Sequence, residues 1–104
     1  MDESVKRILD ELIERYPRLI VCREDIQNAY ELLKECYDND GKLLIGGNGG
    51  SCADSAHIVG ELMKGFVKPR RISEDMKRLL IDIDKEEGAI LAETLQGALP
   101  AINI

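Results

Sequence analysis

The chain has 104 residues, with 14 Lys and Arg against 20 Asp and Glu, so its formal net charge is −6 at pH 7. Forty-four per cent of the residues are hydrophobic, which suffices for one core, and at this length a second domain is excluded. The acidic balance repels phosphate backbones and anionic lipids, which argues against nucleic-acid and membrane partners.

The N-terminal part of the chain predicts two amphipathic helices. From Ser4 to Tyr16 apolar residues recur at helical spacing, and Pro17 ends the helix. A second stripe runs from Ile26 to Tyr37 and stops before Gly41, which is expected to close the helix in the left-handed conformation. The two helices form a helical arm, and their apolar faces either meet another subunit or fold back on their own domain.

A short strand and a glycine-rich turn follow the arm. Lys42 to Ile45 is an apolar run bounded by glycines, which is typical of a fully buried strand in a parallel sheet. The sequence GGNGGS at residues 46–51 then leads into a predicted helix from Ser51 to Met63. Strand, glycine loop and helix together are the opening unit of an α/β fold.

The C-terminal part predicts two more helices and a second strand. Residues 67–71 form a basic loop broken by proline, and Ser73 is expected to cap a helix that runs to about residue 82. A further helix is predicted over residues 86–95, and residues 101–104 have the pattern of a strand. A parallel strand needs neighbours, so we expect further chain or a partner to complete the sheet.

The cysteines and the N-terminus indicate the compartment. Cys22, Cys36 and Cys52 are odd in number and have no CxxC spacing, which argues against a disulfide framework or a thiolate zinc site. They are expected to be reduced and half-buried. No apolar signal region opens the chain, and no apolar run approaches the roughly 20 residues of a membrane helix. A cytoplasmic location is therefore expected.

The glycine loop is a candidate anion site. Glycines let backbone N–H groups approach a ligand closely, and the positive end of the following helix favours a phosphate or carboxylate. Tight glycine turns also serve as plain connections. The loop is not a Walker motif, because no Lys-Ser/Thr follows. It is not a dinucleotide fingerprint either, because Cys52 stands where the third glycine should be.

Ser51 and Asp54 have the spacing of a capping box at the start of this helix. The pattern favours a structural role for Asp54. For Ser51 two roles stay open, that of a helix cap and that of a hydroxyl presented to a ligand.

His57, the one histidine in the chain, is followed four residues later by Glu61. On a helix this spacing places imidazole and carboxylate side by side, one turn into the body from the anion-binding end. Such a pair forms half of many divalent-metal sites, and a carboxylate beside a substrate carbon suits proton abstraction. A plain surface pair has the same spacing, so both interpretations stay open.

A basic group, Lys64, Lys68, Arg70 and Arg71, lies beyond this helix. It offers charge for an anionic substrate, although a solvated loop is the simpler interpretation.

The stretch from Gly41 to Phe66 resembles the sugar isomerase (SIS) domain family of the phosphoheptose isomerases. The resemblance rests on a strand, then G-N-G-G-S, then D-x-x-H-x-x-x-E-L. The helical arm and the sequence LQGALPAI, Leu95 to Ile102, also resemble this family, so the similarity extends over most of the chain.

The resemblance implies an α/β fold with three αβα layers around a parallel sheet, of which these residues form the N-terminal portion. Residues 1–104 would be one partial SIS domain: the helical arm at 1–40, the strand, glycine loop and helix of the substrate site at 41–66, and a helical segment leading to a second strand at 67–104. It also implies a homo-oligomer, a tetramer or a dimer.

The implied activity is isomerisation of sedoheptulose 7-phosphate, the sugar phosphate substrate, to glycero-manno-heptose 7-phosphate. By resemblance, Asn48, Gly49 and Gly50 fall on the substrate loop, with Ser51 beside it. His57 falls on a zinc ligand, and Glu61 on a residue that binds zinc and substrate and acts as acid and base. Such a shift needs a base for the proton next to the carbonyl and an electrophile for the enediolate.

Two departures from the family are visible. Lys64-Gly65 stands where the family usually has Gly-Arg. The second phosphate loop and the other zinc ligands, a Gln and a His, are expected in a C-terminal half outside these 104 residues. Two alternatives to an isomerase therefore remain: a non-catalytic sugar-phosphate-binding or protein-interaction module of the same fold, and an inactive fragment.

Overall fold

The computed structural model describes residues 1–65 and 67–104, and the chain divides into two compact units, Met1–Gly41 and Lys42–Ile104. The boundary between the units falls one residue after the predicted end of the helical arm. A single partial domain over the whole chain stays a prediction. Phe66, the last residue of the predicted substrate-site segment, lies outside the described residues.

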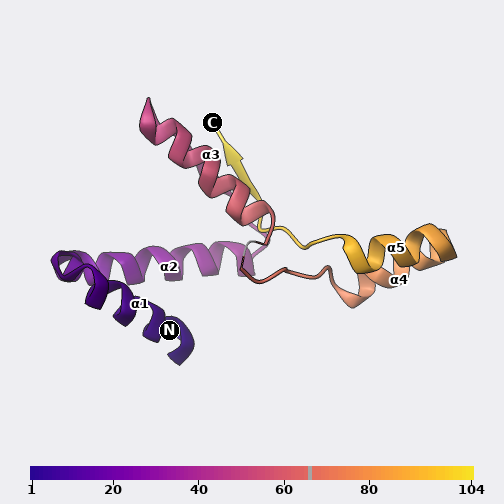
Figure 1. Cartoon of the computed structure of the whole chain (residues 1–104), viewed down its shortest axis with the longest axis horizontal. Helices are drawn as coiled ribbons and strands as arrows, with labels where there is room; N and C mark the ends of the chain where they lie inside the picture. The colour runs from indigo at the N-terminus through magenta and orange to yellow at the C-terminus, as the bar shows by residue number, and fades with distance from the viewer. Residues whose placement is uncertain (66) are drawn as a thin grey trace. The chain divides into compact units, whose positions relative to one another are not determined.

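The first unit consists of two helices joined by a short 3-10 helix (Figure 1). Helix α1 spans Glu3–Arg15, the 3-10 helix η1 spans Pro17–Cys22, and α2 spans Arg23–Asp38. Pro17 opens η1, where its missing N–H costs no hydrogen bond. The two predicted helices are confirmed, whereas the 3-10 helix was not predicted.

Packing within this unit buries only part of the predicted apolar stripes. Leu9 is 5% exposed, and the Arg23 guanidinium pairs with the Asp10 carboxylate, which joins the start of α2 to α1. Ile8 and Leu32 remain 65% and 68% exposed. The arm therefore keeps apolar surface that its own helices do not cover.

The end of α2 corrects one prediction. Asp40, with φ of 56°, takes the left-handed conformation that was expected of Gly41. The Gly41 N–H donates to the Cys36 carbonyl at 2.8 Å, and a Cβ on Gly41 would lie 2.5 Å from the Cys36 Sγ. Glycine is needed here for close approach, and an aspartate adopts the positive φ, as this residue type tolerates.

The second unit contains a parallel pair of strands, β1 (Leu43–Ile45) and β2 (Ala101–Asn103). Leu43 lies opposite Ala101, and Ile45 opposite Asn103. The predicted mixed α/β class with parallel strands is confirmed. The prediction that the first strand is fully buried is wrong for these residues: Leu44 is 55% exposed, because the described sheet has only two strands to cover it.

Three helices lie between the two strands in sequence: α3 (Gly50–Met63), α4 (Glu74–Ile83) and α5 (Lys85–Thr94). Helix α3 runs beside β2, and α4 packs against α5 as a helical hairpin (Figure 1). The Ser73 side chain accepts a hydrogen bond from the Met76 N–H at 3.2 Å, which confirms the predicted cap of α4. Ala92 in α5 is 2% exposed and forms part of the small core.

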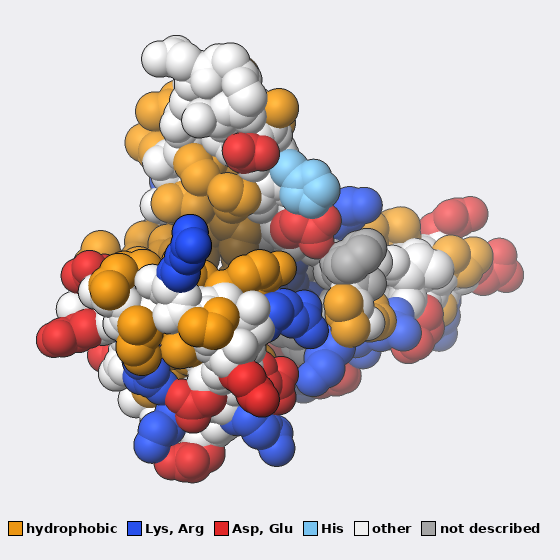
Figure 2. Space-filling model, turned by 60° about the vertical axis from the view of Figure 1, so that its left-hand side comes forward, with side chains coloured by type: hydrophobic (Ala, Val, Ile, Leu, Met, Phe, Trp, Pro, Cys, Tyr) orange, Lys and Arg blue, Asp and Glu red, His pale blue; other side chains and the backbone are white. Residues whose placement is uncertain are grey.

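Apolar side chains remain exposed in many places, as the orange surface in Figure 2 shows; Val21 is 89% and Ile83 is 83% exposed. Among the described residues, no helix combines the length and the apolar character needed to cross a bilayer. None of the described cysteines forms a disulfide. Cys22 and Cys36 are half-buried as predicted, whereas Cys52 is exposed.

Candidate functional site

The glycine loop begins α3 without help from a side chain. Gly49 is the residue that precedes the helix, and its φ of 59° and ψ of −124° suit glycine alone. A Cβ on Gly47 would lie 2.6 Å from the Ser51 carbonyl, so glycine is required there by contact. The loop residues Asn48 to Ser51 are exposed, which leaves them open to a ligand.

The predicted capping box is wrong. The helix begins at Gly50, one residue earlier than expected, so Ser51 lies inside the first turn instead of before it. No side chain caps α3, and the Ser51 N–H donates to the Asn48 carbonyl at 3.1 Å. Ser51 does not cap the helix and is exposed, so the cap is excluded and the ligand-binding role stays a prediction. Asp54 loses its predicted structural role.

The start of α3 favours an anion. The first turn contains no acidic residue, so nothing there offsets the positive end of the helix dipole. The first N–H groups of a helix have no carbonyl partner within it, and here the loop satisfies only some of them through the Asn48 and Gly49 carbonyls. A phosphate or carboxylate is the ligand type that such a terminus binds.

His57 and Glu61 lie side by side on α3, as their spacing predicted. The His57 Nε2 is 3.4 Å from the Glu61 Oε1, and the two side chains are 76% and 40% exposed. The imidazole is visible at the surface in pale blue in Figure 2. Their distance from the loop was predicted too short: at 1.5 Å per residue from Gly50, His57 lies about 10 Å and Glu61 about 16 Å along the helix. An extended ligand is needed to reach from the loop to Glu61, whose side chain leans back toward the helix start.

The pair provides two donors of the kind that zinc binds, an imidazole nitrogen and a carboxylate oxygen. Within residues 1–65 and 67–104, no three His, Cys, Asp or Glu side chains are grouped closely enough to hold a metal ion. A catalytic zinc usually has three protein ligands. The pair therefore supplies two of the three ligands, and a third must come from elsewhere.

A buried serine connects α3 to the sheet, and sequence reasoning missed it. Ser55 is 2% exposed, and its Oγ lies 3.0 Å from the Asn103 Oδ1 in β2 and 2.8 Å from the Cys52 carbonyl. The available signal was a serine in the middle of an apolar helix face. Asn103 had no assigned role in the sequence.

The basic loop has a structural task at the other end of α3. The Arg70 guanidinium donates to the carbonyls of Glu61, Leu62 and Lys64, at 3.1, 2.7 and 3.0 Å. These carbonyls belong to the last turn and the end of α3, where a cation is favourable. Arg70 therefore caps the end of α3, instead of binding substrate or lying in a solvated loop as the sequence suggested.

Two further contacts hold the segment that follows α3. The Arg71 guanidinium donates to the Glu93 carbonyl at 2.5 Å, near the end of α5. The Gly65 N–H donates to the Gln96 Oε1 at 2.7 Å. Lys64-Gly65, where the family usually has Gly-Arg, thus lies in a segment that backbone contacts hold in place.

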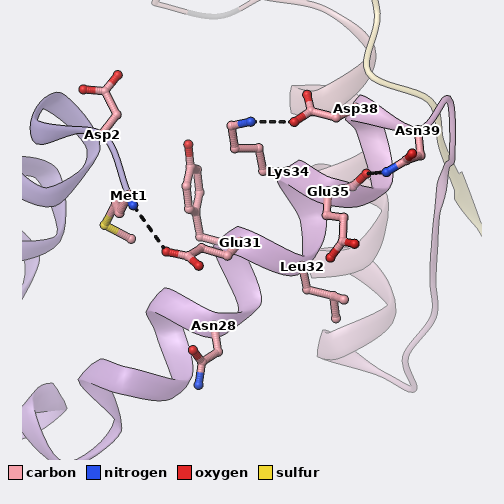
Figure 3. A pocket seen from close by; sticks show the side chains of 10 residues that line it. Met1, Asp2, Asn28, Glu31, Leu32, Lys34, Glu35, Asp38 and Asn39 are labelled. Carbon is pink, nitrogen blue, oxygen red and sulfur yellow. Dashed lines mark hydrogen bonds and ion pairs between the residues drawn. The ribbon is translucent and has the colours of Figure 1, made fainter.

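The first unit has its own surface cavity of about 680 Å³, between the N-terminus and α2 (Figure 3). The Met1 amino group lies 3.6 Å from the Glu31 carboxylate, and the Lys34 ammonium donates to the Asp38 carboxylate. This hydrogen bond raises the pKa of Lys34 above its ordinary value. The cavity contains none of the predicted site residues, so the candidate site remains on α3.

Comparison with known proteins supports the resemblance. A phosphoheptose isomerase of Campylobacter jejuni subsp. jejuni serotype O:6 is 45% identical to this chain over 51 residues, which are 49% of this chain and 27% of that protein. Phosphoheptose isomerases of Neisseria meningitidis and Neisseria gonorrhoeae are 47% identical over 47 residues, which are 45% of this chain and 24% of those proteins.

The chain thus spans about a quarter of the length of the curated relatives it matches. No protein-family model matches the chain, and no solved structure gives a significant match. The resemblance predicted from the glycine loop and the helix after it is confirmed: over about half of its length, this chain is similar to phosphoheptose isomerases.

Proposed function

We propose that the chain is part of a phosphosugar isomerase that interconverts sedoheptulose 7-phosphate and glycero-manno-heptose 7-phosphate. The observation that carries the proposal is the adjacent His57 and Glu61, 3.4 Å apart on the exposed face of a helix that begins at an uncapped glycine loop. The similarity to proteins named phosphoheptose isomerase supports the same reaction class.

In this proposal the loop residues Asn48, Gly49, Gly50 and Ser51 bind the substrate. Backbone N–H groups at the start of α3 hold an anionic or polar end of the sugar phosphate, and the Ser51 hydroxyl adds a hydrogen bond. The substrate extends along the helix toward Glu61. The separation between loop and carboxylate favours a long sugar phosphate over a short one.

Glu61 acts as the acid and base. Its carboxylate takes the proton from the carbon next to the carbonyl, the C–H electron pair forms the double bond of the enediolate, and the former carbonyl oxygen becomes negative. Glu61 then returns the proton to the former carbonyl carbon, while a hydroxyl proton passes from one oxygen to the other. A carboxylate has two oxygens, so one can contact His57 while the other carries the proton.

His57 and Glu61 are also the proposed ligands of a zinc or other divalent ion. When bound, such an ion supplies the electrophile that stabilises the negative oxygen. We further propose a cytoplasmic homo-oligomer, a tetramer or dimer. The exposed apolar side chains of the helical arm, Ile8 and Leu32 among them, support an assembly of this kind.

The test is deuterium incorporation from heavy water into sedoheptulose 7-phosphate, with zinc present, in the parent chain and in Glu61→Gln. Removing the base should lower the exchange rate by about 100-fold or more. Glu93→Gln, the same change at an exposed glutamate of α5, is the matched control and should leave the rate unchanged.

Equal exchange in the parent and in Glu61→Gln would refute the role of Glu61. Absence of exchange in the parent would refute catalysis by this chain. If calorimetric titration still showed sugar-phosphate binding in that case, the chain would be a non-catalytic binding module.

A further inference from the structure

The inference starts from Ser55, the one polar residue that is buried among the described residues, at 2% exposure. Its Oγ lies 3.0 Å from the Asn103 Oδ1, although the two residues are 48 positions apart in sequence. The same oxygen lies 2.8 Å from the Cys52 carbonyl in the first turn of α3. One serine thus connects β2 to the turn that follows the glycine loop.

Apolar packing alone does not define how α3 is rotated on the strand. At about 100° per residue, six of its apolar side chains cover nearly half of the helix circumference, and Ala53 lies farther round. The six are Cys52, Ala56, Ile58, Val59, Leu62 and Met63. Such a wide face can be turned by tens of degrees and still bury a similar apolar area, because hydrophobic burial is not directional.

The observed rotation has Ser55 at its centre. Val59 and Leu62, on either side of Ser55 around the helix, are half-buried, whereas Ile58 and Met63 farther round are 42% and 46% exposed. A hydrogen bond is directional, whereas apolar contacts are not. The bond from the buried Ser55 to Asn103 therefore selects one rotation out of the range that apolar contacts permit.

This rotation places the candidate site. His57 and Glu61 lie roughly 200° and 240° around the helix from Ser55, which is the side turned away from the strand. With Ser55 held at β2, both side chains must face outward, in line with their 76% and 40% exposure.

We propose that Ser55 and Asn103 are positioning residues: the hydrogen bond from the buried Ser55 hydroxyl to the exposed Asn103 side chain fixes the rotation of α3 on β2 and thereby presents His57 and Glu61 together on the open face of the helix. This inference rests on the proposed function for its catalytic consequence, though not for its structural part.

The experiment compares the parent chain with Ser55→Ala, Asn103→Leu and the double variant. Leucine removes the Asn103 Oδ1, which accepts from the Ser55 hydroxyl, together with the amide nitrogen. Ser73→Ala is the matched control, because it removes a serine hydrogen bond elsewhere in the same unit, to the Met76 N–H at 3.2 Å.

Two readouts are needed. The first is the proton NMR signal of the His57 ring, which is unambiguous because the chain has a single histidine. The second is kcat and KM for the deuterium exchange reaction.

The changed side chain in Asn103→Leu lies on the opposite side of α3 from His57. In this variant the His57 ring signal should shift or broaden. Ser55→Ala and the double variant should show the same change. The value of kcat should fall by about 10- to 100-fold, as expected for a misplaced catalytic group, with a smaller change in KM. Ser73→Ala should leave both readouts unchanged.

An unchanged His57 signal in Asn103→Leu would overturn the proposal, as would an equal change in Ser73→Ala. A further shift in the double variant beyond either single variant would also count against it, because two partners of one bond are not additive. If the parent shows no exchange, the proposed function fails, while the NMR comparison still decides the positioning role.

Discussion

Helices α3 and α4 belong to the same unit and begin in opposite ways. Helix α4 follows Ser73, whose hydroxyl accepts the Met76 N–H, and α5 likewise follows Asp84, whose carboxylate accepts two N–H groups at 3.0 and 2.8 Å. Helix α3 follows Gly49 and has no side-chain cap. The first turns of α4 and α5 also carry acidic residues, which α3 lacks: Glu74, Asp75, Glu86 and Glu87.

The difference separates helix starts that side chains cap from one that no side chain caps. A side-chain cap and nearby carboxylates satisfy the first N–H groups and offset the helix dipole, which stabilises the helix. The same groups would compete with an anion. Helix α3 lacks that stabilisation. Loop carbonyls accept from the Ser51 and Cys52 N–H groups, while the positive end of the helix remains available at the loop where the substrate is proposed to bind.

The largest effect should follow Gly49→Ala, because an alanine is strained at φ of 59° and ψ of −124°. Strain of about 1–3 kcal/mol should weaken sedoheptulose 7-phosphate binding by roughly tenfold or more, measured by calorimetric titration. Gly60→Ala, farther along α3, is the control: no atom lies within 4 Å of the added Cβ, and binding should persist. Equal loss in both variants would mean that the conformation of Gly49 is not what the loop requires.

A substitution in the helical hairpin of α4 and α5 should lower the stability of the chain and leave sugar-phosphate binding unchanged. In Gly88→Ala the added Cβ would lie 2.1 Å from the Leu80 carbonyl oxygen, so α4 and α5 must separate. Urea denaturation should show a loss of about 1–3 kcal/mol in the free energy of unfolding, with sugar-phosphate binding retained. Gly60→Ala in α3 meets no atom within 4 Å and should instead stabilise the chain by about 0.5–1 kcal/mol.

A matched pair of serines tests the helix starts directly. Ser73→Ala removes the cap of α4 and should cost about 1 kcal/mol in the free energy of unfolding, without weakening substrate binding. Ser51→Ala removes no cap and should change stability by less than about 0.5 kcal/mol, yet weaken binding. The opposite pattern, with the larger stability loss at Ser51, would restore the capping box that the sequence predicted.

The smallest effect concerns the end of a helix. Asp38 is the last residue of α2, and its hydrogen bond with Lys34 raises the pKa of Lys34. A raised pKa in the folded state contributes stability that is complete below the pKa of an unfolded lysine, about 10.4, and is lost as the pH rises through the folded value. The difference in urea midpoint between the parent and Lys34→Met should therefore shrink above that pH. A difference that grows with pH would contradict the assignment.

The sequence predicted the helices and strands better than it predicted the contacts between them. The helices of the arm, the helix after the loop and the caps of α4 were placed within a few residues, because apolar periodicity and capping residues act over a few positions. The His57–Glu61 pair also follows from spacing alone. The start of α3 was placed one residue late, because a serine near a helix start resembles a cap whether or not it accepts the bond.

The sequence by itself determined the order of the elements, the glycine loop, the adjacent imidazole and carboxylate, and the similarity to phosphoheptose isomerases. Only the tertiary structure decided what holds α3 in place: Arg70 on the carbonyls at its end, and Ser55 on Asn103 at its buried face. The physical reason is range. Periodicity is read from neighbouring residues, whereas a hydrogen bond across 48 positions exists only because the chain returns to that point, which no local pattern encodes.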